Sequence, residues 1–374
     1  EIFVGAPDTE VGTTSTVYQY DAMPGAPMPI LSGTGALGRA LVVGDITGDG
    51  LAEVIAGAPL RNDPPTHRGA VDVYSASGSF AEVVSPNPVA EGQFGDAVAW
   101  LADVNSDGVG DFAVSEPGTG SIHVYFGALL GGAPSLAATL ILPVLMGHYG
   151  SSMDACDTDA DGRMDLILGV PEAGSGGVVY IFTDPTNREG PIEEIPAPDG
   201  AAGFGTAVRC VPDITTNGLN DVLIGAPDTG VSGAVFVRES GAFGYLPRVP
   251  LEDEGTRVGY GETVDTMRFG GGYDIIVGSA VDGSDVLRLR SSLEGGFWSI
   301  LDATGQWESP APPNVEILQA GACVVRVGLQ QDGEPWTLAV ANESGLTRYG
   351  STGMLFGPPA APSGPPLNFG TVCR

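Results

Sequence analysis

The sequence predicts an all-β fold made of repeated units, and three observations support this prediction. Glycine occurs 58 times and proline 30 times in 374 residues, so few windows contain enough strong helix formers for a helix of normal length. Short runs rich in β-branched and aromatic residues, such as residues 71–74 and 178–182, are bounded by glycine or proline. One pattern also recurs along the chain about every 55 residues.

The recurring pattern is a glycine preceded by an aromatic or apolar residue, then an acidic loop, then a strand that ends in Gly-Ala-Pro or a variant of it. The acidic loops of four clear copies begin at Asp45, Asp103, Asp157 and Asp213, which are 58, 54 and 56 residues apart. Each copy has room for about four strands. Units of this kind fit the blades of a β-propeller better than a solenoid, whose repeats are normally shorter.

The two ends of the chain predict how the propeller closes. Residues 1–7 match residues 53–59 in residue type, and residues 369–373 resemble residues 204–208, the strand before an acidic loop. We therefore expect strands from both chain ends to complete one blade, which closes the ring and removes unpaired sheet edges. The predicted fold class is an all-β, seven-bladed β-propeller closed by pairing of N- and C-terminal strands in one blade.

The predicted propeller takes in residues 1–374 as a single domain. Blades 1 to 4 are expected at residues 35–88, 92–143, 147–197 and 201–252. Blades 5 and 6, in which the pattern is degenerate, are expected at residues 256–302 and 314–357. Blade 7 is expected from residues 1–31 together with residues 367–374, after a stiff proline-rich connector at residues 357–366.

The acidic loops predict calcium sites. Oxygen-bearing side chains recur at positions 1, 3, 5 and 9 of a nine-residue loop, position 7 can add a backbone carbonyl, and glycine at position 6 permits a sharp turn. Ca²⁺ takes about six to eight oxygen ligands and fits this pattern better than Mg²⁺, which demands near-octahedral geometry. The candidate ligands are Asp45, Thr47, Asp49, Leu51 and Glu53 in blade 1; Asp103, Asn105, Asp107, Val109 and Asp111 in blade 2; Asp157, Asp159, Asp161, Arg163 and Asp165 in blade 3; and Asp213, Thr215, Asn217, Leu219 and Asp221 in blade 4. We expect about four Ca²⁺ ions that stabilise the ring, bound more weakly in blade 4, which has fewer carboxylates.

Blades 5 and 6 are expected to hold no metal. In blade 5 the same register gives Thr266, Arg268, Gly270 and Asp274, and one hypothesis is that the guanidinium of Arg268 replaces calcium by pairing with Asp265 or Asp274. Blade 6 keeps only residues 332–333, an Asp-Gly pair, of the loop signature. Glycine, glutamine and tryptophan occupy its remaining ligand positions at residues 328, 330 and 336.

The alternation of Phe-Gly, an acidic loop and Gly-Ala-Pro resembles the FG-GAP repeat family, typified by the N-terminal propeller of integrin α subunits. The resemblance covers nearly the whole chain. It implies a seven-bladed ring, calcium in loops on one face, and binding of a ligand or partner by loops on the opposite face or the rim. The sequence departs from the family pattern in blades 5 and 6 and in the closing blade.

Charge and cysteine usage limit the partners and the compartment. The net charge is −31, with 15 arginines and no lysine, so a nucleic acid would be repelled. There is no run of about 18 apolar residues that could span a membrane. We predict disulfides between Cys156 and Cys210 and between Cys323 and Cys373, the alternative being four buried free thiols. Disulfides favour a secreted or cell-surface protein.

The sequence contains no recognisable catalytic motif. None of His67, His123 and His148 lies in a catalytic string, and His123 is expected to be a packing residue within a strand. Trp298, Trp307 and Trp336 are expected to pack between blades or, alternatively, to contact a carbohydrate or protein. We therefore expect an extracellular binding or adhesion module for a protein or glycan and not an enzyme. The alternatives are a structural subunit of a surface assembly or filament, and a polysaccharide-active enzyme that uses a pair of carboxylates.

Overall fold

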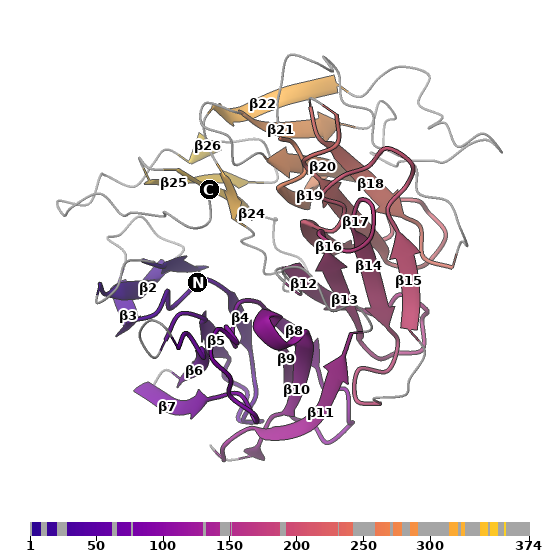
Figure 1. The fold of residues 1–374 in the computed structure, drawn as a ribbon. Helices are drawn as coiled ribbons and strands as arrows, with labels where there is room; N and C mark the ends of the chain where they lie inside the picture. Colours follow the sequence, from indigo (N-terminus) through magenta and orange to yellow (C-terminus); the bar gives the residue numbers. More distant parts are fainter. Residues whose placement is uncertain are drawn as a thin grey trace. The chain divides into compact units, whose positions relative to one another are not determined.

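The computed structural model contains many β-strands and very little helix in the part of the chain that it describes (Figure 1). The described residues are 2–8, 13–20, 28–61, 66–75, 78–129, 132–142, 150, 152–187, 192–230, 232–241, 259–269, 272–278, 285–290, 314–320, 323–325, 337–342, 345–350 and 355–356. The prediction of an all-β chain is confirmed. The predicted proline-rich connector, the predicted C-terminal strand of blade 7, His148 and the three tryptophans at 298, 307 and 336 lie outside the described residues.

Seven sheets form from the described strands, and within each sheet the strands follow one another in chain order. The first sheet is β1 (Ile2–Ala6), β2 (Ser15–Tyr20) and β3 (Met28–Gly33). The second is β4 (Leu41–Gly44), β5 (Glu53–Ala58), β6 (Ala70–Ser75) and β7 (Gly78–Val83). The third is β8 (Val98–Ala102), β9 (Asp111–Glu116), β10 (Ser121–Phe126) and β11 (Ser135–Ile141). The fourth is β12 (Ser152–Cys156), β13 (Asp165–Val170), β14 (Val178–Phe182) and β15 (Ile192–Pro196).

The remaining three sheets follow the same plan. The fifth is β16 (Ala207–Val211), β17 (Asp221–Ala226) and β18 (Ala234–Arg238). The sixth is β19 (Thr263–Phe269), β20 (Gly272–Gly278), β21 (Asp285–Arg290) and β22 (Asn314–Ala320). The seventh is β23 (Cys323–Val325), β24 (Thr337–Asn342), β25 (Gly345–Gly350) and β26 (Leu355–Phe356). Helical structure among the described residues is confined to short 3₁₀ segments, such as the single turn Pro117–Thr119.

Strand pairing changes one boundary expected from the sequence. Residues 314–320 were assigned to the start of the sixth repeat, but β22 pairs antiparallel with β21 and completes the sheet of β19–β21. This pairing has no local sequence signal, because the last strands of these sheets carry neither the acidic loop nor the Gly-Ala-Pro ending. The strand before the degenerate loop of the next repeat is instead β23, which pairs with β24.

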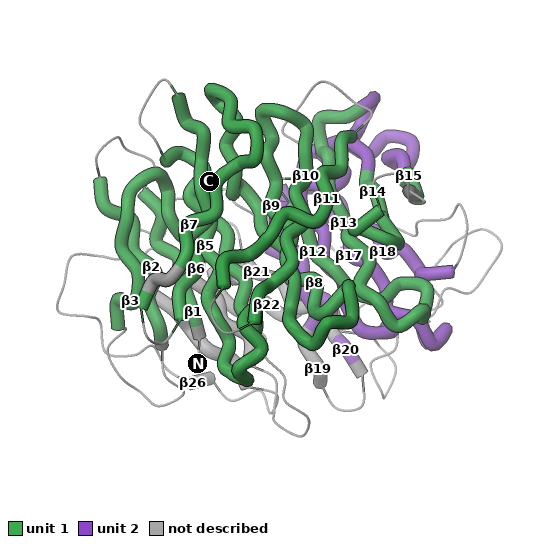
Figure 2. Tube along the Cα trace, turned by 90° about the horizontal axis from the view of Figure 1, so that it is seen from below, with its two compact units in different colours: residues 1–173, 179–195, 368–371 green, residues 174–178, 196–367, 372–374 purple. Residues whose placement is uncertain are grey.

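The chain divides into two compact units (Figure 2). The first consists mainly of residues 1–173 and 179–195, and the second mainly of residues 174–178 and 196–367. Each unit contains several of the sheets described above, and the repeat is seen independently in both.

The glycines of the repeat allow neighbouring sheets to approach closely. Gly57 near the end of β5 lies against Gly95 of the next repeat, and a Cβ atom at Gly57 would overlap the Gly95 carbonyl oxygen. The same contact joins Gly225 to Gly261 in the second unit. Phe94, which precedes Gly95, is fully buried in a core that also contains residues of β5, β6 and β9. The glycine of one repeat thus makes room for the Phe-Gly pair of the next.

Strands that follow the acidic loops are buried along their whole length. All six residues of β5, β9, β13 and β17 are buried, because each of these strands is the second of its sheet and is covered on both faces. The first residue of each of them is position 9 of the acidic loop. The fold therefore places an acidic side chain at the start of a completely buried strand in four successive repeats.

Replacing Gly57 by alanine tests the close contact between repeats. We expect Gly57→Ala to lower the free energy of unfolding by about 1–3 kcal/mol, because the added methyl group meets a backbone carbonyl that cannot move aside. Urea denaturation followed by tryptophan fluorescence measures this. Gly132→Ala is the control, since its Cβ would meet at closest a side-chain atom of Ala128 at 3.0 Å. An equal loss in the two variants would contradict the packing argument.

Candidate metal centres

The four acidic loops have the same backbone conformation. Each joins the first and second strands of a sheet, and the glycine at position 6 has a φ of 85°, 87°, 87° or 89° at Gly50, Gly108, Gly162 and Gly218. A Cβ atom at these glycines would meet nothing within 4 Å. Glycine is therefore required by the left-handed backbone and not by lack of space. Position 4 is left-handed in all four loops as well, even where it is Ser106, Ala160 or Thr216.

The carboxylate at position 1 holds each loop together from inside. It accepts a hydrogen bond from the backbone N–H of the position 6 glycine in every loop, at 2.8 Å for Asp45, 2.7 Å for Asp103, 2.9 Å for Asp157 and 2.8 Å for Asp213. For Asp45, burial alone would raise the pKa, but the backbone N–H groups that surround the carboxylate outweigh it and lower the pKa. The lowered pKa keeps the Asp45 carboxylate ionised.

The carboxylate at position 9 is buried and hydrogen-bonds to the start of the loop. Glu53 is 1 % exposed and Asp111, Asp165 and Asp221 are 0 % exposed. Each accepts a hydrogen bond from the backbone N–H of position 2, at 3.0 Å, 3.0 Å, 2.7 Å and 2.8 Å respectively. The four loops therefore share one hydrogen-bonding scheme as well as one backbone.

Burial perturbs the position 9 carboxylates strongly. Desolvation raises the pKa of Asp111, Asp165 and Asp221 to about 6, and the neighbouring loop carboxylates add to the shift. Desolvation also raises the pKa of Glu53. A buried carboxylate beside other carboxylates is unfavourable unless a proton or a cation compensates its charge.

The third loop brings three carboxylates close enough together to bind one metal ion. Ligand oxygens of Asp157, Asp159 and Asp165 lie within 4.8 Å of one another, so one ion could contact all three. The Oδ2 atom of Asp165 accepts hydrogen bonds from the backbone N–H and the hydroxyl of Thr158, whereas its buried Oδ1 atom has no hydrogen-bond partner. A buried carboxylate oxygen without a donor, in a set made only of oxygen ligands, fits a hard cation such as Ca²⁺.

The fourth loop differs from the third in ways that reduce the need for an ion. Both carboxylate oxygens of Asp221 accept hydrogen bonds, because Thr215 donates its backbone N–H to Oδ2 and its hydroxyl to Oδ1 at 3.1 Å. The side-chain amide of Asn217, at position 5, donates to the Ser240 carbonyl at 2.7 Å. These contacts support the expectation that the fourth loop binds calcium more weakly than the third.

Side chains at positions 3 and 5 form further hydrogen bonds within the loops. Position 5 accepts the backbone N–H of position 7 in every loop, which places Leu51, Val109, Arg163 and Leu219 at equivalent points of the turn. Thr47 at position 3 is bonded to Asp45, while Asn105 at position 3 donates to Asp107 at 2.9 Å. The predicted residues of each loop are therefore brought together, and their role as ligands stays a prediction.

The fifth repeat has no comparable loop. β19 and β20 form a tight hairpin in which Phe269 pairs with Gly272, so the nine-residue loop of the other repeats is missing there. The side chains of Arg268 and Asp274 lie outside the described residues. A different arginine approaches Asp265: the Nε atom of Arg209 on β16 is 3.9 Å from its Oδ2 atom. The predicted loop of the sixth repeat, residues 326–336, is also outside the described residues.

Two of the four cysteines, Cys156 and Cys210, are oxidised. Cys156 and Cys210 are each disulfide-bonded, and no free cysteine occurs among the described residues. The alternative of free thiols is therefore wrong for these two residues. The pairing of Cys156 with Cys210 stays a prediction, as does that of Cys323 with Cys373, whose side chains lie outside the described residues.

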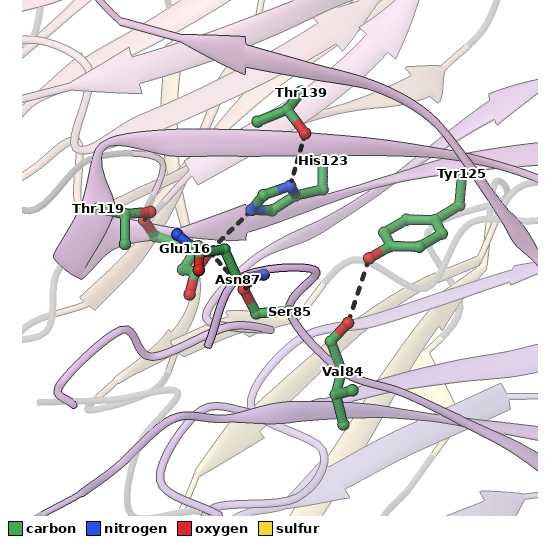
Figure 3. Close-up of polar contacts among 8 residues, drawn as sticks. All are labelled: Val84, Ser85, Asn87, Glu116, Thr119, His123, Tyr125 and Thr139. Atoms are coloured by element: carbon green, nitrogen blue, oxygen red, sulfur yellow. Dashed lines mark hydrogen bonds and ion pairs between the residues drawn. The ribbon is translucent and has the colours of Figure 1, made fainter. Parts of the chain in front are cut away.

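A buried polar cluster that the sequence did not reveal lies in the third sheet (Figure 3). His123 on β10 contacts the carboxylate of Glu116 at the end of β9, with Nε2 and Oε2 2.8 Å apart and side chains 3 % and 2 % exposed. Ser85 donates its hydroxyl to the same carboxylate oxygen at 2.9 Å, and Thr139 contacts the other imidazole nitrogen at 3.1 Å. The serine hydroxyl contacts the carboxylate and not the imidazole, so this is not the nucleophile and base pair of a hydrolase.

The family comparison agrees with the repeat seen in the structure. The model of the FG-GAP repeat matches residues 37–74 and 149–182, two segments that each contain an acidic loop and the strands on both sides of it. The chain contains FG-GAP repeats. The Phe-Gly and Gly-Ala-Pro elements that give the repeat its name are the ones whose glycines meet between neighbouring sheets.

Several animal proteins with curated descriptions are similar to this FG-GAP chain. Integrin alpha pat-2 of Caenorhabditis briggsae is 27% identical over 62% of the chain and 20% of that protein. Integrin alpha-PS5 of Drosophila melanogaster is 30% identical over 39% of the chain and 16% of that protein. The human phosphatidylinositol-glycan-specific phospholipase D is 31% identical over 38% of the chain and 19% of that protein. The similarity thus spans a fifth or less of each relative.

One FG-GAP element was not predicted from the sequence. Tyr260 and Gly261 form the aromatic-glycine pair of the fifth repeat: Tyr260 is 2 % exposed, and the backbone of Gly233 bridges to it as that of Gly69 bridges to Phe94. The pair could have been found from the sequence, since it follows the Phe204 and Gly205 pair at the spacing of the other repeats.

Substitution of Asp165 tests the third loop. We expect Asp165→Asn to lower the melting temperature by several degrees in millimolar calcium, because a ligand is lost, and to leave it unchanged or higher in a chelator, because a buried unpaired charge is removed. Differential scanning calorimetry measures both. Asp199→Asn, at an exposed carboxylate outside the loops, is the matched control and is expected to change neither value. A decrease of equal size with and without calcium would show that Asp165 acts only in packing.

The Glu116 and His123 pair can be tested by copying another repeat. Ala226 and Phe236 occupy the equivalent positions in the fifth sheet, where Phe236 lies 5.6 Å from Phe204 just as His123 lies 5.6 Å from Phe94. We expect His123→Ala to cost about 3–5 kcal/mol of unfolding free energy, because it leaves a buried carboxylate without its partner. The double variant Glu116→Ala with His123→Phe should recover more than half of this loss in urea denaturation. A double variant as unstable as the single one would contradict the assignment.

Proposed function

We propose that this FG-GAP chain is a calcium-stabilised β-propeller that acts as an extracellular binding or adhesion module for a protein or glycan partner. The observation that carries the proposal is that four loops in successive repeats share one conformation. Each of them places a carboxylate at the start of a fully buried strand. Burial of a carboxylate at the same position of four repeats is unfavourable near neutral pH unless a cation compensates its charge. Calcium is the ligand that the oxygen-only set and the loop geometry fit best.

The proposed sites number about four, one for each of the loops that begin at Asp45, Asp103, Asp157 and Asp213. Side chains at positions 1, 3, 5 and 9 and the carbonyl of position 7 would hold each ion. The third loop is the best-supported site, because three of its carboxylates already converge and one buried oxygen lacks a donor. When bound, the ion supplies positive charge that offsets repulsion between the loop carboxylates.

The proposed architecture is a single ring of seven blades. The seven sheets of the described residues support it, as does the position of β1, which corresponds to the second strand of the other sheets and pairs only with β2 within the described residues. We propose that residues 367–374 pair with the open edge of β1 and so complete the blade. Closure of this kind would join the two chain ends in one sheet.

The proposal of adhesion and of an extracellular location rests on the relatives and on the cysteines. Integrin alpha subunits are the relatives whose match covers most of the chain among those named above. Oxidised Cys156 and Cys210 favour an oxidising compartment. Among the described residues, no helix has both the length and the apolar character needed to cross a membrane. A ring with loops on two faces would offer one face to calcium and the other face or the rim to the partner.

We propose a binding protein and not an enzyme. The match to the human phospholipase covers 19% of that protein, so it concerns the repeat region that the two chains share. Within the described residues, the buried histidine is bonded to a glutamate and a threonine in an arrangement that does not activate a nucleophile. The clustered carboxylates lie in loops that the proposal assigns to calcium.

A pH titration separates calcium binding from general acid effects. The folded, metal-free chain holds protons on Asp111, Asp165 and Asp221 up to pH about 6, whereas the unfolded chain releases them near pH 3.8, so more protons are bound in the folded state in this window. The contribution of these groups to metal-free stability is therefore lost as the pH rises through about 4 to 6. Calcium must displace these protons, so we expect its affinity to fall as the pH drops below about 6.

Isothermal titration calorimetry with calcium at pH 7.5 and at pH 5 measures this effect. We expect at least a tenfold weaker apparent affinity at pH 5, and proton release on binding in that range. A chelator should lower the melting temperature at pH 7.5 by more than it does at pH 5. Affinity that is independent of pH would contradict the assignment of the position 9 carboxylates as ligands.

A further inference from the structure

The last strand of the third sheet, β11, has no charge or proline to protect its edge. β11 (Ser135–Ile141) pairs with β10, and no second partner strand occurs within the described residues. An open sheet edge is a template for pairing with another strand unless charge, proline or a bulge prevents it. The pairing of β11 with β10 has one register shift, or β-bulge. The pairings of β3 with β2 and of β7 with β6 have the same kind of shift, so the bulge does not distinguish β11 from these strands.

Except for the two-residue strand β26, the other last strands carry charge or proline that β11 lacks. Proline lies within β3, Glu82 lies on β7, and β15 contains two glutamates and a proline. β22 contains Glu316. Among these strands β11 alone consists only of uncharged residues other than proline, Ser-Leu-Ala-Ala-Thr-Leu-Ile.

The surroundings of β11 in the sequence are also uncharged and expose apolar side chains. No Asp, Glu, Lys or Arg occurs between Glu116 and Asp154, although charged residues make up 16% of the chain. This segment holds three of the six large hydrophobic side chains that are exposed in the described part of the chain: Leu129 at 62 %, Leu136 at 41 % and Ile141 at 73 %. Leu129 lies beside Gly48 in the first acidic loop, but Leu136 and Ile141 belong to β11 itself. Exposed apolar side chains on an open sheet edge mark an interaction surface.

We propose that the β11 edge is the site at which a second copy of this chain docks, by antiparallel pairing of β11 with β11 of the other copy. The charge of the chain selects this partner. Two copies with a net charge of −31 repel each other over most of their surfaces, and an edge without charges is where they can meet without placing carboxylates side by side. A cationic partner would instead be attracted to the acidic surface and would have no need of a neutral strand.

Antiparallel pairing about a twofold axis gives each copy the same contact, as a closed dimer requires. Residues 135–141 contain no proline, so every outward N–H of the strand can donate to the other copy. The interface is small, and the dimer should be weak and dependent on protein concentration. Its dependence on salt is distinctive: screening reduces the repulsion between the acidic copies, so association should strengthen as the ionic strength rises.

Sedimentation velocity at constant millimolar calcium tests the proposal, over a series of protein concentrations in about 0.05 M and about 0.5 M NaCl. We expect association to be at least tenfold tighter at the higher salt. Ile141→Glu should weaken it at least tenfold by placing carboxylates on the edge. Met28→Glu is the matched control, since it adds one carboxylate at a residue that is 49 % exposed on the last strand of another sheet, and it should have little effect.

Melting curves of both variants establish that they are folded, and Ser135→Glu, at the opposite and exposed end of β11, provides a second test should Ile141→Glu be unstable. A protein that stays monomeric at every concentration and salt would overturn the proposal. So would association that weakens with salt, which would indicate contact between opposite charges, or association that Ile141→Glu and Met28→Glu change equally.

Discussion

The burial of a carboxylate at the first residue of the second strand is the constraint on which this FG-GAP structure depends. Asp165 illustrates it: the side chain is 0 % exposed, its pKa is raised to about 6, and one of its oxygens has no donor. The same position is buried in three other repeats. Each loop is shaped around it by a glycine in a left-handed conformation and by backbone N–H groups that bond to the loop carboxylates. Loop geometry, strand burial and the proposed calcium binding follow from one requirement, compensation of a charge that water cannot reach.

The same repeat also explains how the sheets fit together. The glycine near the end of β5 has no side chain and so leaves room for the backbone of Gly95. The adjoining Phe94 fills the core between two sheets. The acidic loop and the Phe-Gly contact lie at opposite ends of the second strand, so one strand fixes both. The Glu116 and His123 cluster departs from this scheme in a single repeat, where a glutamate takes the place that alanine has in Ala58 and Ala226, and the structure satisfies it with a histidine and a serine.

The sequence predicted those features that depend on residues close together in the chain. The loops at Asp45 and Asp157, their left-handed glycines and the all-β character follow from local spacing and composition. Features that depend on strand pairing were not accessible: β22 belongs to the sheet of β21, and Glu116 meets His123 because the register of β9 and β10 brings them together. The disulfide bonding of Cys156 was expected from the equivalent placement of cysteines in successive repeats. Closure of the ring depends on residues 367–374 and stays a proposal.

The most direct test of the account is the number of calcium ions that one chain binds. Native mass spectrometry or inductively coupled plasma analysis of the chelator-treated protein after dialysis against micromolar calcium gives this number. The account predicts about four ions per chain, and one fewer when the position 9 carboxylate of a single loop is replaced by its amide. A chain that binds no calcium, or one whose bound calcium is unchanged by such replacements, would contradict it.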